Sequence, residues 1–138
     1  MASTKNVSPA RRGNSRGRYF GYPIAPGEII FAGSLVCVNA NGQLQRPQTA
    51  GSVAFVGLAQ SGYNNSASTA PGPTIIAGCD AFYLPVPGAT PANINQPVYC
   101  TDDNTLTLAA PAAGFEAPIG ALIGIENGAT VIGVRGYQ

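Results

Sequence analysis

The strongest constraint on the fold is a hairpin pattern that occurs twice. Residues 97–108 read Pro-Val-Tyr-Cys-Thr-Asp-Asp-Asn-Thr-Leu-Thr-Leu, an apolar strand, a turn centred on Asp103-Asn104 and a strand that alternates threonine with leucine. A similar layout begins 62 positions earlier, where Leu35–Val38 precedes an Asn-Gly tip at Asn41-Gly42 and a second strand. Asn-Gly favours a type I′ turn, because both of its central residues need a positive φ. The pattern predicts one β-module used twice, with residues 36–38 paired antiparallel to residues 44–46.

Turn-forming residues interrupt the chain too often for a long helix. Eighteen glycines and twelve prolines are spread over 138 residues, and no window keeps helical apolar spacing over three turns without one of them. The two modules cover about residues 28–60 and 90–124, residues 61–73 predict a polar exposed loop, and Asn127-Gly128 predicts a further hairpin turn. Further strands are expected at residues 28–31, 53–59, 74–86, 119–126 and 129–135.

These short strands predict a single small all-β domain. A jelly roll, a β-sandwich and a barrel-like fold all suit the pattern. Residues 53–59 are apolar on both faces, which indicates a central strand covered on each side. No stretch is apolar enough for a transmembrane helix, and the first residues do not resemble a signal peptide.

The charges divide the chain into a basic arm and a mildly acidic body. Residues 1–18 hold five basic residues and no acidic one, whereas residues 19–138 hold two basic and six acidic residues, a net charge of −4. Val7 is the only large aliphatic residue of the arm after Met1. Such a segment cannot offset its own ordering entropy, so we expect an extended, flexible N-terminal arm over residues 1–18.

Three aromatic residues, Tyr19, Phe20 and Tyr22, stand where the arm meets the body. Two interpretations are open for them. Their rings can close one end of the core, or they can form an exposed anchor beside the arginines, since aromatic residues and arginine are enriched in binding hot spots.

The residue types needed for catalysis are scarce. Histidine is absent, so no Ser-His or Cys-His nucleophile can form. Asp102 and Asp103 are adjacent in a turn, and we expect them to be exposed, splayed and unsuited to acid–base work. Cys37, Cys79 and Cys100 are widely spaced, which predicts buried free thiols in a reducing compartment. We therefore expect no enzyme, no cofactor and no metal site.

Most of the chain, about residues 27–135, resembles a known family, and the late residues carry the resemblance most clearly. The block Gln-Pro-Val-Tyr-Cys-Thr-Asp-Asp-Asn-Thr-Leu at residues 96–106 leads into a closing Ile-Gly…Asn-Gly…Val hairpin at residues 119–134. This layout is similar to that of small all-β, jelly-roll-like decoration (cement) proteins of tailed-bacteriophage capsids. The resemblance implies a structural virion protein on the outer surface of an icosahedral head, assembled in the host cytoplasm.

In that family the partner is the major capsid protein, which the decoration protein bridges and stabilises. The low content of charged residues and the two-fold positions of a capsid predict self-association, with a homodimer favoured and a trimer next. We expect neither a membrane nor a specific nucleic acid as partner. We expect the capsid contact to lie in the arm and the aromatic residues after it: Lys5, Arg11, Arg12, Arg16, Arg18, Tyr19, Phe20 and Tyr22. The alternatives are a glycan- or receptor-binding module of a virion and, third, a protein that binds nucleic acid through the basic arm.

Overall fold

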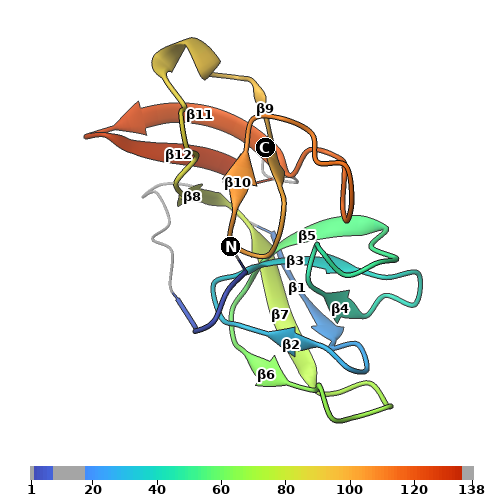
Figure 1. The fold of residues 1–138 in the computed structure, drawn as a ribbon. Coiled ribbons are helices and arrows are strands. Elements are labelled where there is room, and N and C mark those ends of the chain that lie inside the picture. Colours follow the sequence, from blue (N-terminus) through green and yellow to red (C-terminus); the bar gives the residue numbers. More distant parts are fainter. Residues whose placement is uncertain (1, 8–17, 135–138) are drawn as a thin grey trace.

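The computed structural model describes residues 2–7 and 18–134, and this part of the chain is a single small all-β domain (Figure 1). It contains no α-helix, only one short 3₁₀ turn, and no helix that could span a membrane. The prediction of a single small all-β domain is thus confirmed. The elements are β1 (Arg18–Pro23), β2 (Ile29–Ile30), β3 (Leu35–Val38), β4 (Leu44–Gln45), β5 (Ala54–Ala59), β6 (Tyr63–Asn64), β7 (Thr74–Cys79), β8 (Ala81–Tyr83), η1 (Pro91–Asn93), β9 (Pro97–Cys100), β10 (Leu106–Thr107), β11 (Gly120–Glu126) and β12 (Ala129–Val134).

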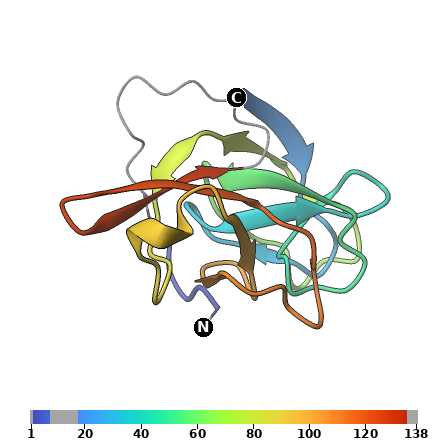
Figure 2. The same cartoon turned by 90° about the horizontal axis from the view of Figure 1, so that it is seen from above.

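Ten of the strands form two antiparallel five-stranded sheets. The first sheet has the order β1-β7-β5-β3-β4, and the second has the order β10-β9-β11-β12-β8. A small third sheet pairs β2 with β6. The chain finishes the strands of the first sheet with β7 and passes through Asp80 into β8 of the second. The β11–β12 hairpin, red in Figure 2, projects beyond the rest of the domain.

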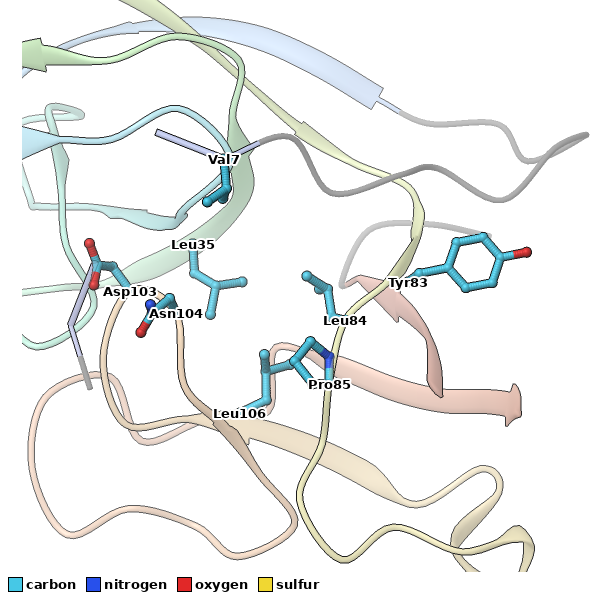
Figure 3. Close-up of a pocket in the computed structure, with 9 residues that line it drawn as sticks. Val7, Leu35, Tyr83, Leu84, Pro85, Asp103, Asn104 and Leu106 are labelled. Atoms are coloured by element: carbon cyan, nitrogen blue, oxygen red, sulfur yellow. The ribbon is translucent and has the colours of Figure 1, made fainter. Parts of the chain in front are cut away.

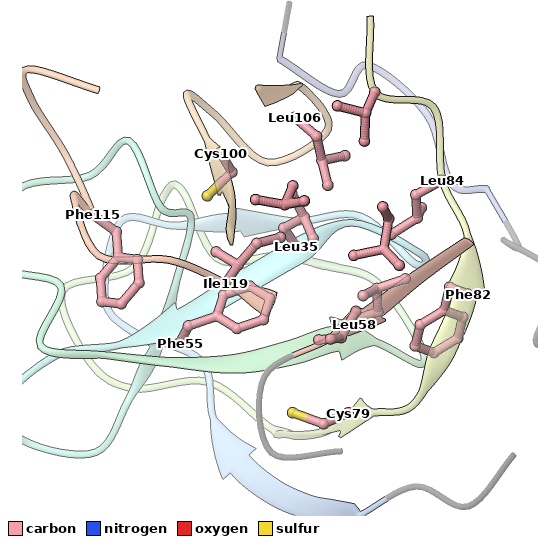
Figure 4. Close-up of a cluster of buried hydrophobic side chains, with 14 of the residues drawn as sticks. Leu35, Phe55, Leu58, Cys79, Phe82, Leu84, Cys100, Leu106, Phe115 and Ile119 are labelled. Carbon is pink, nitrogen blue, oxygen red and sulfur yellow. The ribbon is translucent and has the colours of Figure 1, made fainter. Parts of the chain in front are cut away.

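The main hydrophobic cluster draws side chains from both large sheets (Figure 4). The first sheet contributes residues such as Leu35 and Leu58, and the second contributes residues such as Cys100 and Leu122. A smaller cluster, which includes Ile30 of β2 and Ala59 of β5, belongs to the other side of the first sheet. Strand β5 supplies both clusters, as its apolar sequence predicts.

A β-bulge lets β5 place Phe55 and Leu58 in the same cluster although they are three residues apart. Val36 pairs with Gly57 and Cys37 pairs with Phe55, so Val56 is an extra residue without a partner on β3. The extra residue reverses the alternation of side chains along the strand. Gly57 has φ +117°, and a Cβ there would lie 2.0 Å from the carbonyl oxygen of Gly78 on β7.

The two sheets repeat the same pairing pattern. Val38 pairs with Leu44 in the first sheet. In the second sheet Cys100 pairs with Leu106, and each of these residues lies 62 positions after its counterpart in the first pair. Each hairpin then pairs with a longer strand that follows it: β3 with β5, and β9 with β11. The sequence repeat therefore corresponds to a repeat of strand order and register.

The Asn-Gly turns differ from each other. Asn127 and Gly128 have φ values of 52° and 81°, so a two-residue type I′ turn joins β11 to β12 as predicted. At Asn41-Gly42 the predicted hairpin is confirmed by the pairing of β3 with β4. The predicted type I′ turn is wrong, because only Gly42 of the two residues has a positive φ. The side chain of Asn39 accepts hydrogen bonds from the backbone N–H groups of Asn41 and Gln43, which favours a longer loop.

Two other predicted segments also differ. Residues 61–73, predicted as a loop, contain β6, because Tyr63 and Asn64 pair with β2. Residues 74–86, predicted as one strand region, divide at Asp80 into strands of different sheets.

The close approach at Gly57 predicts a large loss of stability on substitution. Gly57→Ala places a Cβ against the backbone of Gly78 and forces alanine into an unfavourable φ, so we expect a loss of about 3 kcal/mol. Gly42→Ala is the matched control, because Gly42 has φ +74° but no atom within 4 Å of the added Cβ. Its expected loss is about 1 kcal/mol. Denaturant unfolding measures both, and equal losses would contradict the role of the contact.

Candidate functional site

The expected contact residues are only partly within the described structure. Arg11, Arg12 and Arg16 lie outside the described residues, and Arg18 is the first residue of β1. Lys5 is exposed on the segment 2–7. The three aromatic residues lie on β1, which is an edge strand of the first sheet.

The aromatic residues of β1 divide between a structural and an exposed role. The Tyr19 ring occupies the space above Gly78, where an added Cβ would lie 2.0 Å from it, and the Tyr19 hydroxyl donates to Asp80 Oδ2 at 3.1 Å. Tyr22 packs against the smaller core cluster. Phe20 is 68% exposed, with its ring centroid 5.2 Å from that of Tyr22. Tyr19 and Tyr22 thus pack against the body, whereas Phe20 presents most of an apolar ring to solvent. The role of these residues as an anchor stays a prediction.

Residues 2–7, which we call the strap, lie against the body. The Ser3 N–H donates to Asp103 Oδ1 at 2.8 Å, and the Val7 N–H donates to the Ala32 carbonyl at 2.7 Å. Asn6 Oδ1 accepts the Ala32 N–H at 2.7 Å. Two backbone N–H groups and one side chain of the strap therefore have partners on the body. The flexibility of the arm stays a prediction. Residues 8–17, the other part of the expected arm, lie outside the described residues.

The strap also accounts for the position of Asp103, which the sequence predicts incorrectly. Asp103 is fully buried rather than exposed. Its side chain accepts the Ser3 N–H, and its backbone carbonyl accepts the Leu35 N–H at 2.8 Å. Asp103 Oδ2 is buried and has no hydrogen-bond partner in the described part of the chain. The Ser3 contact spans 100 positions in sequence, so no local pattern signals it.

A cavity of about 270 Å³ lies beside the strap (Figure 3). Its walls are mainly apolar, with Leu35, Leu84 and Leu106 from the body and Val7 from the strap. Asp103 and Asn104 add polar atoms at one side. Such walls suit an apolar group rather than a reacting one. Within residues 2–7 and 18–134, no group of three histidine, cysteine or acidic side chains is placed to hold a metal ion.

The three cysteines are buried free thiols, as predicted. Burial raises the pKa of Cys100 to about 12, and the nearby carboxylates of Asp102 and Asp103 add to this effect. Burial also raises the pKa of Cys37 well above its usual range, and the neighbouring Cys100 contributes. Because the thiolate is the nucleophile, we expect Cys37 and Cys100 to react slowly near neutral pH.

Thiol labelling provides a test of this environment. At pH 8 a thiol with a pKa of about 12 has a thiolate fraction roughly a thousand times smaller than an ordinary cysteine, so Cys100 should label very slowly in the folded protein. Unfolding in guanidinium should make all three cysteines react at the ordinary rate, which mass spectrometry after iodoacetamide treatment can follow. Rapid labelling of Cys100 in the folded state would contradict the assignment.

The described surface thus combines an exposed phenylalanine on an edge strand, a docked strap and a small apolar cavity. Comparison with protein families, characterised proteins and solved structures finds no match to this chain.

Proposed function

We propose that the protein is a structural virion protein that decorates an icosahedral phage head and stabilises it by bridging major capsid proteins. The observation that carries the proposal is the exposure of Phe20 in the first strand after the basic segment. Exposed aromatic rings beside arginines have the composition of a binding hot spot. The resemblance of residues 96–106 and 119–134 to decoration proteins supplies the class of partner.

The finer fold that we propose is a β-sandwich. Two five-stranded sheets contribute to one hydrophobic cluster, which supports this alternative over a closed barrel. The chain also completes the strands of one sheet before it begins the other. That order favours a sandwich of two similar halves over the Greek-key connections of a jelly roll.

The proposed capsid contact combines the positive charge of the arginines with the apolar area of the Phe20 ring. Arginine guanidinium groups pair bidentately with carboxylates, so Arg11, Arg12, Arg16 and Arg18 suit an acidic protein surface. A single exposed ion pair contributes about 0–1 kcal/mol, so several pairs and the ring of Phe20 must act together. Many copies on one head then convert modest individual contacts into reinforcement.

We also propose that the body self-associates, with a homodimer favoured and a trimer next. Charged residues make up only 9% of the chain, and few charges leave little to oppose association of the surface. Isologous contacts also suit two-fold positions on a capsid.

Decoration of purified heads tests the contribution of Phe20 to the proposed capsid contact. Phe20→Ala should leave the body folded, because the ring is mostly exposed, and should weaken capsid binding about tenfold by removing a hot-spot side chain. Ile123→Ala is a matched control, since Ile123 is a 43% exposed apolar residue of the second sheet. Bound copies per head, measured against protein concentration, should fall for the first variant only. Equal binding by the two variants would exclude Phe20 from the contact.

The contribution of the arginines to capsid binding can be recognised by its dependence on ionic strength. Replacing Arg11, Arg12, Arg16 and Arg18 by alanine should weaken decoration and flatten its dependence on ionic strength, because exposed ion pairs are screened by salt. The same titration with naked DNA distinguishes the nucleic-acid alternative. If this variant decorates heads normally at physiological salt, the arginines are not part of the contact, and the contact must lie on the body.

A further inference from the structure

The surface under the strap, which we call the bed, consists of Ala32, Gly33, Gly62 and Asp103. Its shape and hydrogen-bonding groups are complementary to the strap. Ala32 supplies both a donor and an acceptor to the strap. Gly33 has φ +81°, and a Cβ there would lie 2.2 Å from the Val7 carbonyl oxygen. At Gly62 a Cβ would lie 2.7 Å from Asn6 Oδ1. The two glycines leave room for the strap, so the bed fits this segment closely.

The bed joins parts of the chain that are distant in sequence. Ala32 and Gly33 precede β3 of the first sheet, and Asp103 lies in the turn between β9 and β10 of the second. If the strap leaves, Asp103 loses the Ser3 N–H and keeps no side-chain partner among the described residues. Water or a donor from another chain must then replace the Ser3 N–H, because a carboxylate that stays buried without a donor is unfavourable. The strap therefore stabilises Asp103 in its turn.

The strap itself is held by few contacts. Thr4, Lys5 and Asn6 are exposed, and Val7 is 42% exposed. Ten residues, 8–17, separate the strap from β1. A segment of that length can span up to about 35 Å when extended. A domain of this size has a radius of gyration of about 14 Å, so the bed of an adjacent copy is within reach.

We propose that the strap of one copy occupies the bed of a neighbouring copy when copies are crowded. The contacts are the same within one chain and between two chains, so exchange costs little contact energy. Because only ten residues join the strap to β1, the effective concentration of a chain's own strap at its bed is roughly millimolar, which favours the intramolecular contact in dilute solution. Copies packed side by side reach comparable local concentrations, and the strap then links them. The exchange needs no capsid protein, so it does not depend on the proposed function.

Two full-length variants separate strap from bed. Gly33→Ala blocks the bed, because the three nearest atoms to its Cβ all belong to Val7, and it leaves the strap available to other copies. The double variant Ser3→Pro/Val7→Pro removes two N–H groups that bind the bed and leaves the bed empty. Gly42→Ala is the control for the strain of a positive φ, since Gly42 has nothing within 4 Å.

The test mixes isotope-labelled Ser3→Pro/Val7→Pro protein with unlabelled Gly33→Ala protein at up to millimolar concentration. The amide signals of Ala32 and Leu35 in the labelled protein should shift, and sedimentation should show a one-to-one heterodimer that forms at least ten times more tightly than either variant self-associates. Gly42→Ala protein should cause much smaller shifts, because its strap occupies its own bed. Absence of shifts at millimolar donor would overturn the proposal. Equal shifts when unlabelled Ser3→Pro/Val7→Pro protein is the donor would also overturn it.

Discussion

Two close contacts between neighbouring backbones determine how the sheets are built. Gly57 on β5 lies against the carbonyl of Gly78 on β7, and Gly120 on β11 lies against the carbonyl of Gly133 on β12. Neither position has room for a side chain, so both strands depend on glycine there. In β5 the adjacent bulge changes which residues face the core. Without that extra residue, strict alternation would turn either Phe55 or Leu58 away from the cluster they share.

Local patterns in the sequence predict the hairpins better than the contacts between them. Asn127-Gly128 forms the expected type I′ turn, with a positive φ at both residues. At Asn41-Gly42 the side chain of Asn39 changes the loop, a local effect that the dipeptide alone does not reveal. The burial of Asp103 depends on Ser3, 100 positions away, and its neighbours in the turn carry no sign of it. The exposed ring of Phe20 is predictable as an aromatic beside arginines, but its exposure depends on which face of an edge strand it occupies.

The docked strap and β1 are the points at which the chain contacts the body on either side of residues 8–17. Before these residues the Val7 N–H binds the Ala32 carbonyl, and after them β1 pairs with β7. Three of the arginines that we assign to the capsid contact stand between the two segments, outside the described residues.

The division of strands between the sheets has a consequence for synthesis on the ribosome. All strands of the first sheet lie between residues 18 and 79, and the second sheet begins only at residue 81. The first half can form its hydrogen-bond ladder while the second half is still being made, because folding proceeds as the chain emerges. The strap is made before either sheet, yet Asp103 completes its bed only when β9 and β10 have formed. The strap emerges before both sheets but is thus among the last segments to reach its place, and until then the bed is open to another chain.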